Sequence, residues 1–175
     1  MDPRWIVIVL ANALLAFLGG QLNHYLAPWR MFVSLGGLFI AFVALQLPQR
    51  IGLIAALFAG LICDASQPVH FGFHAFLFGL ATVIVQRQRP RLDRFEPTTQ
   101  RTIALLANLV LFIVTALFHL RHVPAEGRLV SRFLWDLLFS ELVLWAIAPW
   151  FLALQRQALE LADPLAASED RRQVD

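Results

Sequence analysis

The sequence contains few charged side chains, a single cysteine and no lysine. Charged residues make up 15% of the 175 residues, whereas about 25% is usual in soluble domains. Cys63 alone allows neither an internal disulfide nor a metal site built from thiolates, and we interpret it as a small buried apolar residue. All 14 basic residues are arginine, which we attribute to coding bias and not to function.

Most of the sequence consists of long apolar stretches. Hydrophobic residues make up 59% of the chain, and the mean hydropathy is +0.67. A helix that spans a bilayer needs about 20 residues, so about six spans would use about 120 residues and leave only short loops and a tail. The sequence therefore predicts an all-α, polytopic integral membrane protein without a separate soluble catalytic domain. No arginine or acidic residue interrupts residues 5–29, 31–49, 51–63, 65–86, 102–120 or 142–155.

We expect about six transmembrane helices in one bundle over residues 1–156, followed by a disordered cytoplasmic tail at 157–175. The third helix is short, because it would cover about 20 Å of a hydrocarbon core about 30 Å thick. Either Pro48 and a snorkelling Arg50 lengthen it at one end, or the third and fourth segments form a short re-entrant hairpin. The expected spans are residues 5–22, 31–47, 51–63, 71–85, 103–120 and 133–154.

The distribution of arginine predicts the orientation, because positive charge is retained on the cytoplasmic side of a membrane. With the N-terminus inside, eight arginines before the tail fall on the inner side and four on the outer side. We therefore expect both termini in the cytoplasm. The arginines flank apolar segments instead of forming a solvent-facing stripe, which argues for contact with membrane lipid and against nucleic acid. The inner set is Arg4, Arg50, Arg87, Arg89, Arg91, Arg94, Arg101 and Arg156, and the outer set is Arg30, Arg121, Arg128 and Arg132.

Asp64 is the most informative single residue, because it ends an otherwise uncharged stretch. A carboxylate near the middle of a membrane costs about 3 kcal/mol on insertion scales. Its side chain should therefore face protein or water. One interpretation is that Asp64 caps the following turn or lies at the level of the outer headgroups. The alternative is a contact with a ligand, an ion or a partner.

Two histidines follow Asp64 and raise the question of a metal site. His70 and His74 are four residues apart, which places them on one face if both are helical, and two histidines with a carboxylate can bind zinc. The pattern lacks the glutamate that lies between the histidines of a zincin helix. Packing histidines are the alternative interpretation. Ser66 has no neighbouring base or glycine elbow, so a serine nucleophile is disfavoured.

Small residues recur every fourth position in the third and fourth segments. Gly52, Ala56 and Gly60 form a stripe on one helix face, and Ala75 and Gly79 repeat the spacing. Such stripes allow the backbones of membrane helices to approach closely. The pattern predicts tight packing, either between the two segments or against another protein.

Four further polar residues lie within apolar segments. Asp136 can pair with Arg132, which precedes it by four residues, whereas Glu141 lies deeper and needs a partner from elsewhere. Asn12 and Asn108 are expected to form hydrogen bonds between helices.

The run from Gly60 to Gly79 resembles the central signature of the MreD family of rod shape-determining proteins. In that family a glycine-rich span ends in Gly-Leu-x-x-Asp, and a short turn that often contains proline leads to a helix that starts with Gly-x-(Asn, Gln or His)-Ala. The length, the basic loop after the fourth segment and Ala148-Pro149-Trp150 in the last span are also similar. The residues that fall on the signature are Gly60, Leu61, Asp64, Pro68, Gly72, His74 and Ala75.

The resemblance implies a scaffold of the bacterial cell-elongation complex in the inner membrane, without enzymatic activity and without a cofactor. Its implied partners are an MreC-like protein, the MreB filament with RodZ, a SEDS glycosyltransferase and a penicillin-binding transpeptidase, which together build the lateral peptidoglycan wall.

Two other classes of function remain open from the sequence. The MreD family is similar in fold to the substrate-binding subunits of energy-coupling-factor vitamin transporters, and in that alternative Asp64, His74 and Glu141 would line a pocket that opens outward. An intramembrane hydrolase or transferase would instead use Asp64 with His70 or His74.

Overall fold

The computed structural model describes residues 4–66, 70–93, 96–120 and 127–162, and every element of regular secondary structure within them is a helix. The predicted all-α class is therefore confirmed. The helices in chain order are α1 (Arg4–Leu26), η1 (Ala27–Trp29), α2 (Gly36–Gln46), α3 (Gln49–Ser66), α4 (Phe73–Gln88), η2 (Arg89–Arg91), α5 (Pro97–Leu120) and α6 (Gly127–Ala162), where η denotes a 3-10 helix.

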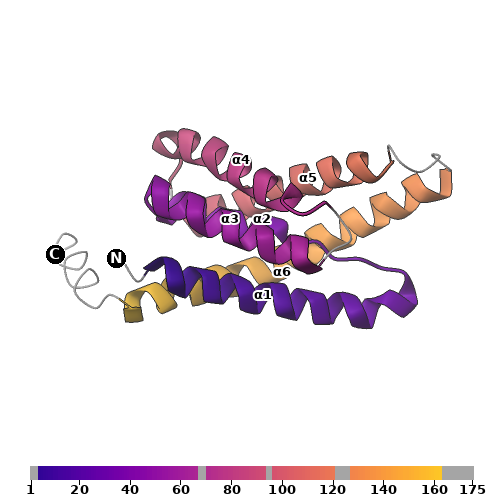
Figure 1. Ribbon diagram of the computed structural model, residues 1–175, viewed down its shortest axis with the longest axis horizontal. Coiled ribbons are helices and arrows are strands. Elements are labelled where there is room, and N and C mark those ends of the chain that lie inside the picture. The colour runs from indigo at the N-terminus through magenta and orange to yellow at the C-terminus, as the bar shows by residue number, and fades with distance from the viewer. Residues whose placement is uncertain (1–3, 67–69, 94–95, 121–126, 163–175) are drawn as a thin grey trace.

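Helix α2 forms the core of the bundle. Every residue from Gly36 to Leu45 is buried, and α2 packs against α3, α4, α5 and α6. An apolar helix without a polar face is expected to be enclosed in this way. Figure 1 shows α4 and α5 along one side of the bundle and α1 along the other, with α2 and α3 between them. Helix α6 packs against both α5 and α1.

The helices alternate in direction, so the connections gather at two ends. The first turn of α1, the last turn of α6 and the α4–α5 connection lie at the same end of the bundle (Figure 1). At this end Arg89 Nη1 donates a hydrogen bond of 3.0 Å to the carbonyl oxygen of Leu47. This bond ties the α4–α5 connection to the α2–α3 connection.

Two helical segments are long and apolar enough to cross a bilayer by length and composition, namely Pro97–Leu120 and Leu129–Leu159. Gly36–Gln46 is apolar but shorter. These helices and the composition indicate a membrane protein. The expected six crossings remain a prediction.

The helix bounds differ from the predicted spans at several places. Helix α2 begins at Gly36 instead of residue 31, and residues 31–35 before it are not helical. Helix α3 is longer than the predicted 51–63, since the backbone N–H of Gly52 donates to the carbonyl oxygen of Pro48 at 2.8 Å and the first turn starts there. Helix α6 continues to Ala162, past the predicted tail boundary at 156, and residues 163–175 lie outside the described part of the chain.

Helix α5 begins at Pro97, about two turns before the predicted residue 103. Proline is favoured at the first helical position because no intrahelical partner awaits its missing N–H. Just before it, the carboxylate of Glu96 accepts hydrogen bonds from the hydroxyls of Thr98 and Thr99. These bonds lower the pKa of the exposed Glu96 carboxyl below its usual value.

Candidate functional site

The carboxylate of Asp64 caps the N-terminus of α4 from the last turn of α3. Its Oδ2 atom accepts the backbone N–H groups of Gly72 at 2.9 Å and Ala75 at 3.3 Å, and its Oδ1 atom accepts that of His74 at 2.9 Å. The first amides of a helix lack intrahelical acceptors and carry partial positive charge. Asp64 therefore satisfies groups that would otherwise be unpaired, and it is itself only 4% exposed.

The imidazole of His74 completes this arrangement. Its Nδ1 atom lies 2.8 Å from Oδ1 of Asp64, and His74 is buried. The ring also has edge contacts with Phe73 and Phe78, with centroids 5.4 and 6.0 Å away. The ring therefore contacts both the carboxylate and two aromatic side chains.

Two glycines make this geometry possible. Gly72 has a φ of 95°, a left-handed conformation that favours glycine, and this turn presents its N–H to Asp64. A Cβ atom on Gly60 would lie 2.3 Å from the Cα atom of Ala75, so α3 can reach the start of α4 only without a side chain at position 60. We call Gly60, Asp64, Gly72, His74 and Ala75 the α3–α4 clasp.

Of the three other residues that the sequence associated with Asp64, the structure describes the side chain of His70 only, and His70 is not part of the clasp. The ring of His70 is exposed and has an edge contact with Phe118 at a centroid distance of 5.9 Å. Pro68 lies outside the described residues, and the side chain of Ser66 is likewise not described. Among the described residues, no group of three histidine, cysteine or acidic side chains could hold a metal ion.

The remaining small residues face two different neighbours. A Cβ atom on Gly52 would lie 2.7 Å from Nε2 of Gln86 on α4 and 3.0 Å from the carbonyl oxygen of Val43 on α2. Gly79 faces Leu57 on α3 at 3.2 Å, and Ala56 is fully buried. The stripe thus packs inside the bundle, against both α2 and α4.

Asn108 on α5 connects α2 to α6. Its Oδ1 atom accepts the backbone N–H of Gly37 at 3.2 Å and the hydroxyl of Ser34 at 3.3 Å. Its Nδ2 atom donates to Oε1 of Glu141 at 3.0 Å. The partner that the sequence left open for Glu141 is therefore an amide on α5 and not a cation.

The non-helical residues before α2 are held by side chains from α1 and α6. Asp136 Oδ1 accepts the N–H of Phe32 at 3.1 Å, and Ser140 Oγ accepts that of Ser34 at 3.0 Å. Asn23 on α1 accepts the N–H of Val33 through Oδ1 at 2.7 Å and donates from Nδ2 to the carbonyl oxygen of Val33 at 2.9 Å. All of these contacts are made with residues 31–35, which we call the entry segment.

Sequence reasoning missed the roles of Asn23, Ser34 and Ser140. A usable signal existed for Ser140, because it follows Asp136 by four residues and therefore shares its helix face. Asn12, the other amide expected in a helix contact, accepts a hydrogen bond of 2.9 Å from Nε2 of Gln155 on α6, and both residues are fully buried.

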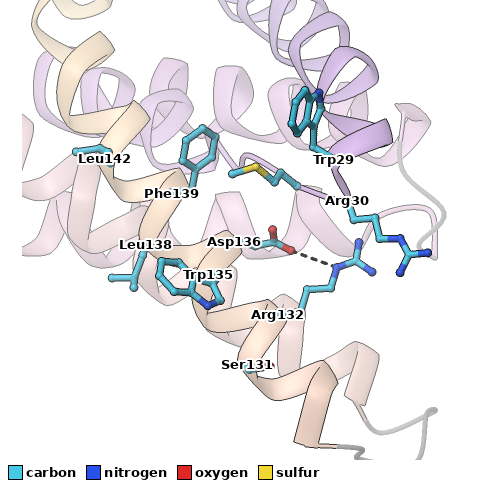
Figure 2. A pocket seen from close by; sticks show the side chains of 10 residues that line it. Trp29, Arg30, Ser131, Arg132, Trp135, Asp136, Leu138, Phe139 and Leu142 are labelled. Atoms are coloured by element: carbon cyan, nitrogen blue, oxygen red, sulfur yellow. Dashed lines mark ion pairs between the residues drawn. The ribbon is translucent and has the colours of Figure 1, made fainter.

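The residues that the transporter alternative needs are engaged in two separate hydrogen-bonded pairs. Asp64 and His74 bind each other, while Glu141 binds Asn108. A cavity of about 590 Å³ does lie between η1 and α6, and Figure 2 shows Arg132 beside Asp136 at its edge. None of Asp64, His74 and Glu141 lines this cavity.

Comparison with known proteins gives one family match. The family model described as rod shape-determining protein MreD matches residues 3–158, which is most of the chain and includes the whole clasp. No curated protein and no solved structure matches the chain significantly.

Proposed function

We propose that this chain, which belongs to the MreD family of rod shape-determining proteins, acts as a membrane scaffold of the cell-elongation machinery. Membership gives a role in determining cell shape. The scaffold role would be to hold an MreC-like protein, the MreB filament with RodZ, a SEDS glycosyltransferase and a penicillin-binding transpeptidase near one another. No reaction or cofactor of its own is required.

The observation that carries this proposal is that the acceptor sites of Asp64 are already used. A carboxylate offers about four acceptor positions, and those of Asp64 face three backbone N–H groups and the His74 ring. A nucleophile, a general base or a metal ligand needs a free lone pair. Asp64 could take such a role only by releasing the start of α4, so the family signature is better explained as a structural clasp.

The outer surface of the bundle suits contacts with lipid and with other membrane helices. Large apolar side chains are exposed on α1 and on α5, including Leu10, Phe17, Leu106 and Leu117, which are between 55% and 65% exposed. In water such a surface would be an interaction site or an aggregation hazard. In a bilayer it offers faces on which partner helices can dock.

We further propose six crossings of the inner membrane, with both termini in the cytoplasm. The 11 residues of α2 cover about 17 Å, and the entry segment before it can add at most about 16 Å. The 18 residues of α3 cover about 27 Å. Non-helical backbone is tolerated at membrane depth where its polar groups are satisfied by protein, as those of the entry segment are. The excess of arginine in the inner loops supports the orientation.

Depletion of the protein in its native cell tests the shape and scaffold roles. We expect rods to become round and newly made wall to lose its lateral distribution, as followed by microscopy with a fluorescent wall label. Wild type and His70→Ala should restore rods, because His70 lies outside the clasp, whereas Asp64→Asn should not. Rods that keep normal lateral wall synthesis after depletion would contradict the proposal, as would purified protein that converts a wall precursor without partners.

A further inference from the structure

The cavity between η1 and α6 carries an excess of positive charge. Arg30 and Arg132 both line it, and Figure 2 shows their guanidinium groups on the same side of the cavity as the carboxylate of Asp136. That carboxylate is already engaged, since Oδ1 accepts the N–H of Phe32 and Oδ2 lies 3.9 Å from Nε of Arg132. The lining of the cavity therefore contains two cations and one partly used carboxylate.

The backbone at Arg30, between η1 and the entry segment, has an unusual conformation. Arg30 has a φ of 55°, in the left-handed region that non-glycine residues seldom adopt. Its N–H closes the short helix η1 by donating to the carbonyl oxygen of Ala27 at 2.9 Å. Backbone outliers of this kind are enriched at ligand clamps, where the surrounding structure enforces them.

Aromatic and apolar side chains lie next to the two arginines. Trp29 and Trp135 line the cavity and are 77% and 72% exposed. Further along α6, Leu138 and Leu142 are 62% and 63% exposed and form an apolar wall. Tryptophan is enriched at the headgroup level of a bilayer, and leucine belongs in its hydrocarbon region. The cavity thus changes from cationic to apolar along α6.

We propose that this cavity binds an anionic phospholipid, with the phosphate on Arg30 and Arg132 and an acyl chain along Leu138 and Leu142. Guanidinium groups bind phosphate through paired hydrogen bonds. The cationic, aromatic and apolar side chains of the cavity would thus lie beside the phosphate, the interfacial region and the acyl chain of a lipid, respectively. The inference rests on the proposed placement in a bilayer. It does not depend on the role in cell shape.

The test is lipid retention by the full-length protein. The protein is reconstituted in nanodiscs of phosphatidylcholine with one fifth phosphatidylglycerol, transferred to detergent and analysed by native mass spectrometry. We expect wild type to retain phosphatidylglycerol in preference to phosphatidylcholine. The double variant Arg30→Gln/Arg132→Gln should lose that preference by about ten-fold or more, since each arginine near an anionic surface contributes to binding. Equal retention of both lipids by wild type, or an unchanged preference in the double variant, would overturn the proposal.

Two further variants separate the cavity from general charge and from folding. Arg50→Gln removes one exposed arginine from α3 at the opposite end of the bundle and should leave the preference unchanged. Leu142→Trp keeps both arginines but fills the apolar wall, and should lower retention while the melting temperature stays near that of wild type. If Arg50→Gln removed the preference instead, the attraction would be general and the site would be refuted.

Photocrosslinking in cells identifies the occupant. With p-benzoylphenylalanine in place of Leu138, we expect adducts with the mass of phosphatidylglycerol that disappear in the Arg30→Gln/Arg132→Gln background. Adducts with a polypeptide alone would show that a protein partner occupies the cavity, and would refute the lipid proposal while leaving the proposed role in cell shape intact.

Discussion

Gly60 and Ala75 approach so closely that a Cβ atom on Gly60 would lie 2.3 Å from the Cα atom of Ala75 and 2.5 Å from its backbone nitrogen. Real Cβ atoms are not found at such distances from backbone. This contact places the C-terminal part of α3 beside the first turn of α4, so that Asp64, one turn beyond Gly60 on α3, reaches the free N–H groups of α4. The family signature therefore encodes a close approach and the hydrogen bonds that it permits.

We expect Gly60→Ala to destabilise the protein by about 1–3 kcal/mol, because the added methyl group must push two backbones apart. Gly20→Ala on α1 is the matched control, since a Cβ atom there would meet nothing within 4 Å. That control should be neutral or stabilising by up to about 1 kcal/mol, as expected for glycine in a helix. Equilibrium unfolding of the purified protein in mixed micelles measures both. Equal effects would show that the contact is not tight.

Asp64→Asn should destabilise the protein by about 3 kcal/mol, because an amide turns one donor toward the N–H groups that the carboxylate accepts. His74→Ala should cost less, about 1–2 kcal/mol, since its backbone N–H still reaches Asp64. Glu96→Gln, which changes an exposed carboxylate, should have the smallest effect of the three. The midpoint of thermal unfolding in detergent ranks them, and a His74→Ala loss as large as that of Asp64→Asn would contradict the clasp geometry.

The position of the clasp could be predicted from the sequence, but its hydrogen bonds could not. Asp64 at the end of an uncharged stretch needs hydrogen-bond partners for its carboxylate. Gly60, four residues earlier on the same helix face, indicates that another helix approaches closely there. Apart from the His74 ring, however, the partners of Asp64 are three backbone N–H groups, and every residue except proline carries such a group. Only the path of the chain through the turn decides which N–H groups reach the carboxylate.

The late start of α2, at Gly36 instead of residue 31, could not be predicted from the hydropathy of residues 31–47. The entry segment is apolar apart from Ser34 and would be expected to continue the helix. It remains non-helical because Asp136 and Ser140, more than 100 residues away in the sequence, accept its N–H groups. Hydropathy records side chains only, so it cannot register hydrogen bonds that distant residues supply to the backbone.

A double-mutant cycle on Asn108 and Glu141 should give a coupling energy of about 0.5–1.5 kcal/mol, the usual range for polar pairs between membrane helices. Asn108→Ala alone should cost more than Glu141→Ala, because it also leaves the N–H of Gly37 and the hydroxyl of Ser34 without their acceptor. Unfolding in mixed micelles gives the four free energies. A coupling near zero would show that the 3.0 Å contact between the two side chains does not contribute to stability.

The proposed crossing of α3 and α4 predicts which side of the membrane their connection faces. Phe71 is 75% exposed just before α4, and Asp93 is exposed in the α4–α5 connection. In a Cys63→Ala background, a membrane-impermeant maleimide should label Phe71→Cys in intact spheroplasts and Asp93→Cys only after the membrane is opened. A re-entrant hairpin would instead bring residue 71 back inside the bilayer and protect it from both sides. Labelling of Phe71→Cys only in opened spheroplasts would reverse the orientation that the arginines predict.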